Sequence, residues 1–173
     1  FIDDFGQSWT PFGSVRADAS FLAYDKSGVN ASQPNFVNAD SQAIARPSAA
    51  TGFTYRFPFA ARQWNMTHVI EPIGQIISSP NEWMANKIPN EDSQSLVFDD
   101  TNLFSVNKFA GYDRVEGGTR ANVGAKYSFI TDSGMSGNVL FGQSFHLTGV
   151  NSFTQGGAAA VGPQSGLDKA KSD

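Results

Sequence analysis

Residues 119–129 alternate between polar and apolar side chains without interruption. Because successive side chains of a β-strand point to opposite faces, this pattern predicts a strand with one apolar and one polar face. The same alternation occurs at residues 14–24, 52–59 and 137–147. It is less regular at residues 67–77, where Pro72 is an awkward residue for a ladder strand. The sequence shows no sustained apolar repeat at helical spacing, so it predicts an all-β protein.

The connections between these strands alternate in length. Long polar segments are expected at residues 25–47, at residues 79–113 and after residue 148, and short turns at residues 62–65 and 131–136. Long loops at one end and short turns at the other are typical of outer-membrane barrels, whereas a soluble sandwich has shorter and more even spacing. The predicted fold class is therefore all-β, with antiparallel strands forming part (about five strands) of a large transmembrane outer-membrane β-barrel.

The charged residues fit this prediction. They make up 16% of the chain, against about 25% in a typical soluble domain. Arg56, Arg120 and Lys126 lie on the polar faces of their strands and are the candidates to face the lumen, because a basic side chain facing lipid costs about 2–4 kcal/mol at mid-bilayer. Aromatic residues near the short turns suit the girdles expected at the membrane interface; these are Phe57, Phe59, Trp64, Tyr127 and Phe129.

Length and composition narrow the alternatives. The chain of 173 residues begins at Phe1, and we expect it to be an internal fragment of a longer chain, with residues 1–173 forming a partial barrel domain. A formal net charge of −4 argues against nucleic-acid binding. The absence of cysteine excludes a disulfide framework and a thiolate metal site.

Few residues suggest a catalytic or metal-binding role. Ser144 and His146 share the polar face of one strand, as any residues two apart do, and no acid completes a triad. The acidic loop cluster (Glu91, Asp92, Asp99, Asp100) does not have the spacing of a calcium loop and is expected to be a solvated face. Catalytic, metal and cofactor residues are accordingly predicted to be absent.

Two further groups carry structural predictions. Gly117 and Gly118 precede a strand and indicate a flexible strand entry or a bulge. The charges at Asp113, Arg114, Glu116 and Arg120 either form an ion-pair network that fixes the loop over the barrel or are solvated independently.

Several short segments, most of them in the long loop, resemble the barrel domain of the LptD family of lipopolysaccharide-assembly proteins. They are Glu71-Pro72, the segment 88–93, Asn102-Leu103-Phe104 and the segment 107–118, which reads NKFAGYDRVEGG. The most specific pattern is N-(R/K)-(F/Y)-x-G-x-D-R-(I/V)-E. We take the following as structural signature residues: Asp92, Ser93, Asn102, Leu103, Phe104, Asn107, Gly111, Asp113, Arg114 and Glu116.

The resemblance implies a function that composition alone does not reach. It implies a part of the outer-membrane translocon that inserts lipopolysaccharide into the outer leaflet, located in the cell outer membrane and performing no enzymatic reaction. The implied partners are lipopolysaccharide, an LptE-type plug lipoprotein, a periplasmic Lpt bridge protein reached through a missing N-terminal domain, and outer-membrane lipid. The alternatives are a generic porin or TonB-dependent receptor barrel, a soluble carbohydrate-binding β-sandwich and, on Ser144 and His146, an outer-membrane enzyme.

Overall fold

The described residues form a single antiparallel sheet of six strands. The computed structural model describes residues 1–23, 37, 41–156 and 165–173. Its strands are β1 (Ser8–Leu22), β2 (Gln42–Arg56), β3 (Phe59–Gln63), β4 (Met66–Ser79), β5 (Gly118–Thr131) and β6 (Ser136–Thr148), followed by the 3-10 turn η1 (Ser152–Thr154). The strand order is β1-β2-β4-β5-β6, with β3 also paired to β4. The predicted all-β class is thus confirmed, and the sheet does not close on itself.

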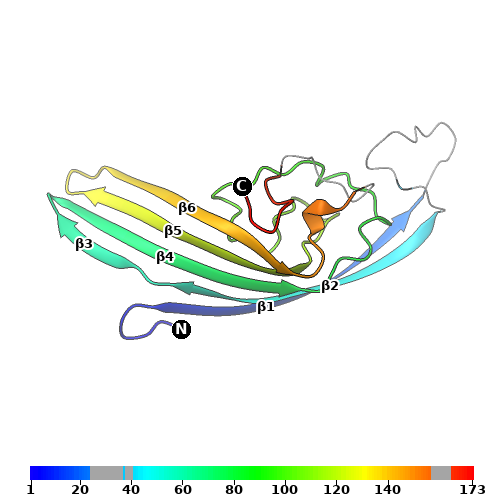
Figure 1. Ribbon diagram of the computed structural model, residues 1–173, viewed down its shortest axis with the longest axis horizontal. Helices are drawn as coiled ribbons and strands as arrows, with labels where there is room; N and C mark the ends of the chain where they lie inside the picture. Colours follow the sequence, from blue (N-terminus) through cyan, green and yellow to red (C-terminus); the bar gives the residue numbers. More distant parts are fainter. Residues whose placement is uncertain (24–36, 38–40, 157–164) are drawn as a thin grey trace.

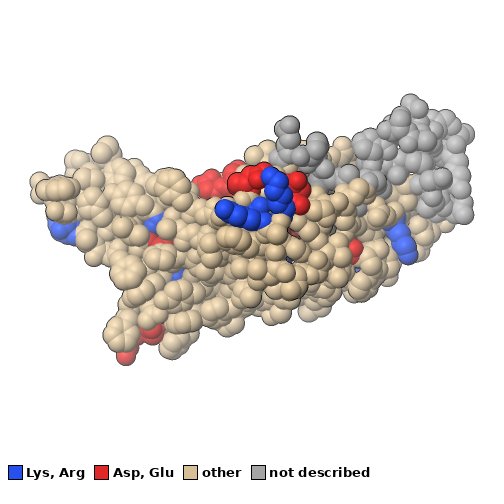
Figure 2. Space-filling model, viewed as in Figure 1, with Lys and Arg blue, Asp and Glu red and all other residues tan. Residues whose placement is uncertain are grey.

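The sheet is curved, and the long connection between β4 and β5 lies on one of its faces together with the C-terminal segment (Figure 1). We call this the inner face; buried polar side chains such as Arg46, Gln75 and Asn122 point into it. The opposite, outer face exposes large apolar side chains along the strands, among them Ile70, Ile76, Val123, Phe141 and Leu147. Most of the strand surface in Figure 2 is uncharged, and charged side chains gather near the loop.

The strand boundaries correct the sequence-based prediction at β2. This strand begins at Gln42 instead of Gly52, so residues 42–47 belong to the sheet and the loop predicted at residues 25–47 is wrong there. The rest of that predicted loop lies largely outside the described residues. The strand predicted at residues 52–59 is broken after Arg56, which is why six strands replace the expected five.

Two prolines explain this break. Pro72 lies inside β4, and its carbonyl accepts a hydrogen bond from the Phe57 amide of the neighbouring segment (3.2 Å). The amide and carbonyl of one strand residue point to the same side, so the missing N–H of Pro72 faces the gap between β2 and β3, where Pro58 also lacks a donor. Pro72 therefore does not interrupt β4, because its own ladder to β5 continues at Ala125.

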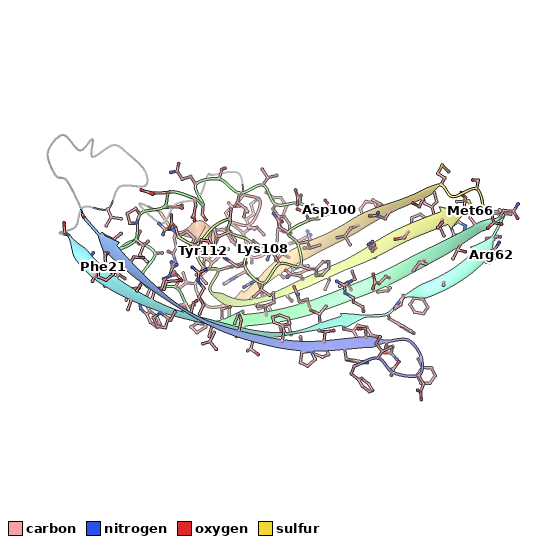
Figure 3. All side chains as sticks on the ribbon, turned by 180° about the vertical axis from the view of Figure 1, so that it is seen from behind. Phe21, Arg62, Met66, Asp100, Lys108 and Tyr112 are labelled. Atoms are coloured by element: carbon pink, nitrogen blue, oxygen red, sulfur yellow. The ribbon has the colours of Figure 1, made fainter. Side chains whose placement is uncertain are left out.

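Both predicted short turns are present. The first places Trp64 and Asn65 at positive φ (51° and 60°), the geometry of a tight two-residue hairpin. The second, between β5 and β6, contains Gly134 at φ 89°. Arg62 and Asp132, 2.8 Å apart, join the two turns. Figure 3 shows Arg62 and Met66 at this end of the sheet, far from Tyr112 and Phe21. Within the described part of the chain, no helix has the length and apolar character needed to cross a membrane.

Candidate functional site: the inward-folded loop

The connection between β4 and β5, residues 80–117, makes many polar contacts, and we call it the inner loop. It has no regular secondary structure, so its backbone groups need other hydrogen-bond partners. Side chains of the loop supply many of them. Labelled loop residues Lys108 and Tyr112 lie on the inner side of the sheet in Figure 3.

Two aspartates hold the two arms of the inner loop together by exchanging contacts. The carboxylate of Asp92 accepts the backbone N–H groups of Tyr112 (2.5 Å) and Asp113 (3.2 Å). In return, the Asp113 carboxylate accepts those of Glu91 (2.8 Å) and Asp92 (3.3 Å). Burial raises the pKa of Asp92, but the backbone donors outweigh it and hold that pKa below its usual value. The Asp92–Asp113 exchange therefore holds the two arms of the loop together while Asp92 is ionised.

Gly111 is required beside this exchange. Its φ of 66° lies in the left-handed region, and a Cβ there would overlap the Asp92 carboxylate. The Ser93 hydroxyl donates to the Ala110 carbonyl, and the Ser93 amide donates to Asn90 Oδ1 (3.0 Å). The turn at residues 90–93 therefore presents Asp92 to the backbone that Gly111 bends toward it.

Asn107 and Arg114 complete the links within the loop. The Asn107 side chain donates to the Arg114 carbonyl (3.2 Å) and accepts the Glu116 amide (3.0 Å), so it pairs like a short piece of strand. The Arg114 guanidinium, in a side chain that is almost fully buried, donates to the carbonyls of Ile88 and Asp113, both at 2.9 Å.

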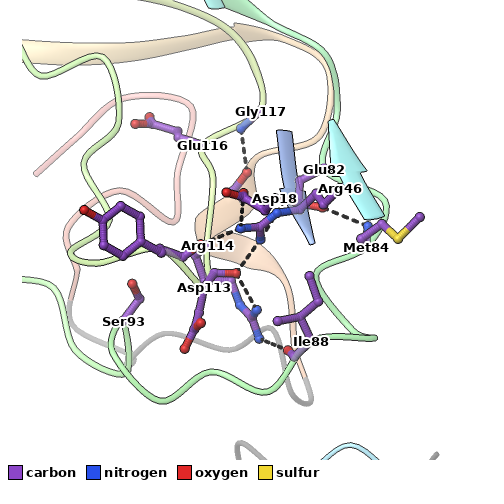
Figure 4. Close-up of polar contacts among 12 residues, drawn as sticks. Asp18, Arg46, Glu82, Met84, Ile88, Ser93, Asp113, Arg114, Glu116 and Gly117 are labelled. Atoms are coloured by element: carbon purple, nitrogen blue, oxygen red, sulfur yellow. Dashed lines mark hydrogen bonds and ion pairs between the residues drawn. The ribbon is translucent and has the colours of Figure 1, made fainter. Parts of the chain in front are cut away.

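Arg46 ties the loop to the sheet (Figure 4). This buried side chain of β2 donates to the carbonyls of Tyr112 and Asp113, the latter at 2.6 Å. Its charge is balanced by Asp18 of β1 at 3.0 Å and by Glu82 of the loop at 3.6 Å. Burying an arginine is costly unless it is paired and hydrogen-bonded, and Arg46 has both kinds of partner.

A second anchor joins the loop to β5. Glu116 accepts Lys108 Nζ at 3.3 Å, and Arg120 Nε lies 3.1 Å from the same carboxylate oxygen. All three side chains are nearly inaccessible to solvent. Burial lowers the pKa of Lys108, and the Glu116 carboxylate opposes that shift. Of the two alternatives for these charges, the ion-pair network is seen for Glu116 and Arg120, whereas the hydrogen bonds of Asp113 and Arg114 described above go to backbone groups.

The tip of the loop packs where two strands carry no side chain. Gly124 and Gly142 face each other across β5 and β6, and a Cβ on either would meet the loop tip: the Phe104 ring at 3.1 Å for Gly124, and Leu103 for Gly142. The Phe104 carbonyl accepts a hydrogen bond from Gln75 Nε2 of β4 (3.1 Å). Gln75 Oε1 in turn accepts one from Asn122 Nδ2 of β5 (2.8 Å). Asn102 shapes the tip by donating to the Val97 carbonyl (2.7 Å).

The structure thus brings the signature residues into one loop with two centres. Asp92, Ser93, Asn107, Gly111, Asp113, Arg114 and Glu116 form the crossing of its arms, and Asn102, Leu103 and Phe104 form its tip. Of the lumen-facing candidates, Arg120 is buried beneath the loop, while Arg56 is half-exposed 3.7 Å from Glu71. Lys126 has the strand parity of Arg120, opposite Glu71 of β4.

Sequence reasoning missed the sheet side of this site. Arg46 lies in the stretch predicted to be loop, although Ile44, Arg46 and Ser48 alternate with small residues that could have indicated a strand. Asp18, Gln75 and Asn122 were not singled out either. Each of them lies on the polar face of its strand, which predicts the face of the sheet to which the side chain points but not the residue that it contacts.

The residues considered for bond chemistry have other roles. The Ser144 hydroxyl donates to Asn122 Oδ1 (2.7 Å), and His146 Nε2 lies 3.1 Å from the Gly149 carbonyl. No hydrogen bond between the two is seen in the described structure. Of the acidic cluster, Asp92 joins the two arms of the loop and Asp99 serves a local turn by accepting the Thr101 amide (2.9 Å). Among the described residues, no group of acidic or histidine side chains is arranged to hold a metal ion.

A comparison with protein-family models gives the decisive observation. The model described as LPS transport system D, LptD, matches residues 1–173, the whole of the chain. The chain belongs to the LptD family. A comparison with curated proteins finds no match. The match to the family model confirms the resemblance inferred from the short sequence segments. LptD proteins are transport components of the Gram-negative outer membrane, so the chain has a role in lipopolysaccharide transport.

Proposed function

We propose that this chain is a wall segment of the outer-membrane LptD barrel, which inserts lipopolysaccharide into the outer leaflet. The observation that carries the proposal is the family match over residues 1–173, together with a sheet that has one apolar and one polar face. An amphiphile needs both environments, a wet lumen for its sugars and an apolar route for its acyl chains.

The two faces of the sheet support a membrane orientation. The outer face carries Val123 and Phe141 in mid-strand, suited to contact lipid, with Phe129 and the exposed Trp64 near the short turns, where an aromatic girdle is expected. The inner face would then line the lumen, with Arg56, Arg120 and Lys126 on it. In this orientation the inner loop occupies the lumen beside β4, β5 and β6.

The remaining partners belong to the same proposal. Apart from short bridges to residues 1–2 and 170–172, the edges of β1 and β6 are left for strands from elsewhere in the protein, since an open sheet edge is not stable in lipid. Residues 1–173 then form part of a larger barrel domain. Its partners are outer-membrane lipid, an LptE-type plug lipoprotein and a periplasmic Lpt bridge protein that delivers lipopolysaccharide through a domain outside this segment.

The test is made with the intact protein in a Gram-negative strain depleted of its own LptD. We expect the intact protein to restore newly labelled lipopolysaccharide at the cell surface. Val123→Arg should reduce the amount of folded barrel, because a charge facing lipid costs about 2–4 kcal/mol near the bilayer centre. Ser128→Arg, on the inner face of the same strand, is the matched control and should be tolerated.

Two results would overturn the proposal. If the intact protein folds in the outer membrane but surface lipopolysaccharide does not recover, the transport role is wrong. If Ser128→Arg prevents folding and Val123→Arg does not, the assignment of the two faces is reversed.

A further inference from the structure

The buried charges beneath the inner loop do not balance. Lys108 and Arg120 carry two positive charges, and Glu116 is the acidic group that interacts with either of them. The side chains of Lys108 and Arg120 are 0% and 2% exposed. A buried charge without a counter-charge is strongly unfavourable, so one further negative charge would stabilise this group.

The guanidinium of Arg120 also has an unused donor. Its Nη2 donates to the Val106 carbonyl, and its Nε lies 3.1 Å from a Glu116 carboxylate oxygen, an ion pair without hydrogen-bond geometry. Its Nη1 is buried and has no hydrogen-bond partner among the described residues. Buried donors of this kind are rarely left unsatisfied in folded proteins, and an occupant at Nη1 is expected.

A small cavity lies at this position. It has a volume of about 10 Å³ and is lined by Arg120, Glu116, Ser144, His146, Ser172 and neighbouring residues of the C-terminal segment. Such a volume holds a single occupant of about the size of a water molecule. The Ser172 oxygen accepts the Ser144 amide (3.1 Å), which leaves its hydroxyl hydrogen free to donate. Lys169, at the rim, is neutralised by Asp173 at 2.9 Å.

We propose that this cavity is a binding site for one small monovalent anion, chloride under ordinary conditions, held by Arg120 Nη1 and the Ser172 hydroxyl. A water molecule would satisfy the donor but would leave the charge excess. The oxygens of Glu116, the acid in the wall, are engaged by Lys108 and Arg120. A phosphate or sugar acid is too large for the space. The anion would thus complete the joint between β5, the inner loop and the C-terminal segment.

The test compares chloride with gluconate, which is too large for the cavity, at equal ionic strength and with the intact protein in detergent. We expect the Tm to rise by several degrees as chloride replaces gluconate and to saturate, because a ligand that binds only the folded state stabilises it. Crystals soaked in bromide should show an anomalous peak beside Arg120 Nη1.

Two variants separate this site from general salt effects. Lys108→Met removes the excess charge and keeps the Glu116–Arg120 pair, so the chloride response should disappear. Arg62→Gln removes an exposed positive charge and should keep the full response. An unchanged chloride response in Lys108→Met, or a site without bromide in the crystal, would overturn the proposal. Neither measurement involves lipopolysaccharide, so the result is independent of the transport proposal.

Discussion

Replacing Gly111 by alanine should release the inner loop from the sheet. Gly111 has φ 66°, and the new Cβ would overlap the Asp92 carboxylate that accepts the Tyr112 and Asp113 amides. The substitution therefore strains the backbone and displaces the carboxylate from both donors. The strands are not touched, so the effect is expected in the loop and not in the fold of the sheet.

The size of the effect follows from these two contributions. A residue other than glycine in the left-handed region costs about 1–2 kcal/mol. Each of the two hydrogen bonds to Asp92 is solvent-accessible and contributes about 0.5–1.5 kcal/mol. The sum is about 2–5 kcal/mol of loop docking. Since about 1.4 kcal/mol corresponds to a factor of ten, the open population should rise at least roughly thirtyfold.

Limited trypsin digestion of the intact protein in detergent measures that population. Lys108 and Arg114 are cleavage points only 3% and 2% exposed in the docked loop, and cleavage of a transiently open segment follows the open population when reclosing is fast. Gly134→Ala is the matched control, because Gly134 also has positive φ but nothing within 4 Å of a new Cβ. Equal cleavage of Gly111→Ala and the unsubstituted protein at Lys108 and Arg114 would refute the role of the Asp92–Asp113 exchange.

Three further outcomes are expected; the first, in acid, is measured by amide hydrogen exchange of the loop, and the other two by the same trypsin digestion. The pKa of Asp92 is lower in the folded protein than in the unfolded chain, so its contribution to docking is complete above the ordinary carboxyl pKa and disappears as pH falls through the lowered value; Asp92→Asn should remove this acid dependence. Arg46→Gln should raise cleavage strongly, since it removes a charged donor from two loop carbonyls and one of the two cations beside Asp18; unchanged cleavage would mean that the loop docks without this anchor. Gly142→Val should displace Leu103 and expose the loop tip, but it should leave the Asp92–Asp113 exchange intact.

The strands could be predicted from the sequence because each has to present two different faces. Alternation was clear wherever bulky apolar residues opposed polar ones, as in β5 and β6. It was weak in the first half of β2, where the apolar positions are Ala43, Ala45 and Ala49, and the strand was therefore placed too late. The break after Arg56 was not predicted, because it depends on two prolines meeting in the register of neighbouring strands.

The inner loop shows the limit of this kind of reasoning. Its signature residues were recognised from the sequence, but their contacts were not. Most of these hydrogen bonds join a side chain to a backbone group far along the chain. Asp92 and Asp113 carry no periodic pattern that would pair them. Arg46 donates to carbonyls that any sequence could provide, so only the three-dimensional arrangement reveals the contact.

The Asp92–Asp113 exchange also has a consequence for folding. β4 and β5 are neighbours joined by the long inner loop, and bringing the ends of a flexible loop together costs more entropy as the loop lengthens, about 0.6 kcal/mol for each doubling. A loop whose arms are already crossed at residues 91–92 and 112–113 behaves as a shorter one. The crossed arms therefore lower the entropy cost of pairing β4 with β5 across this long connection.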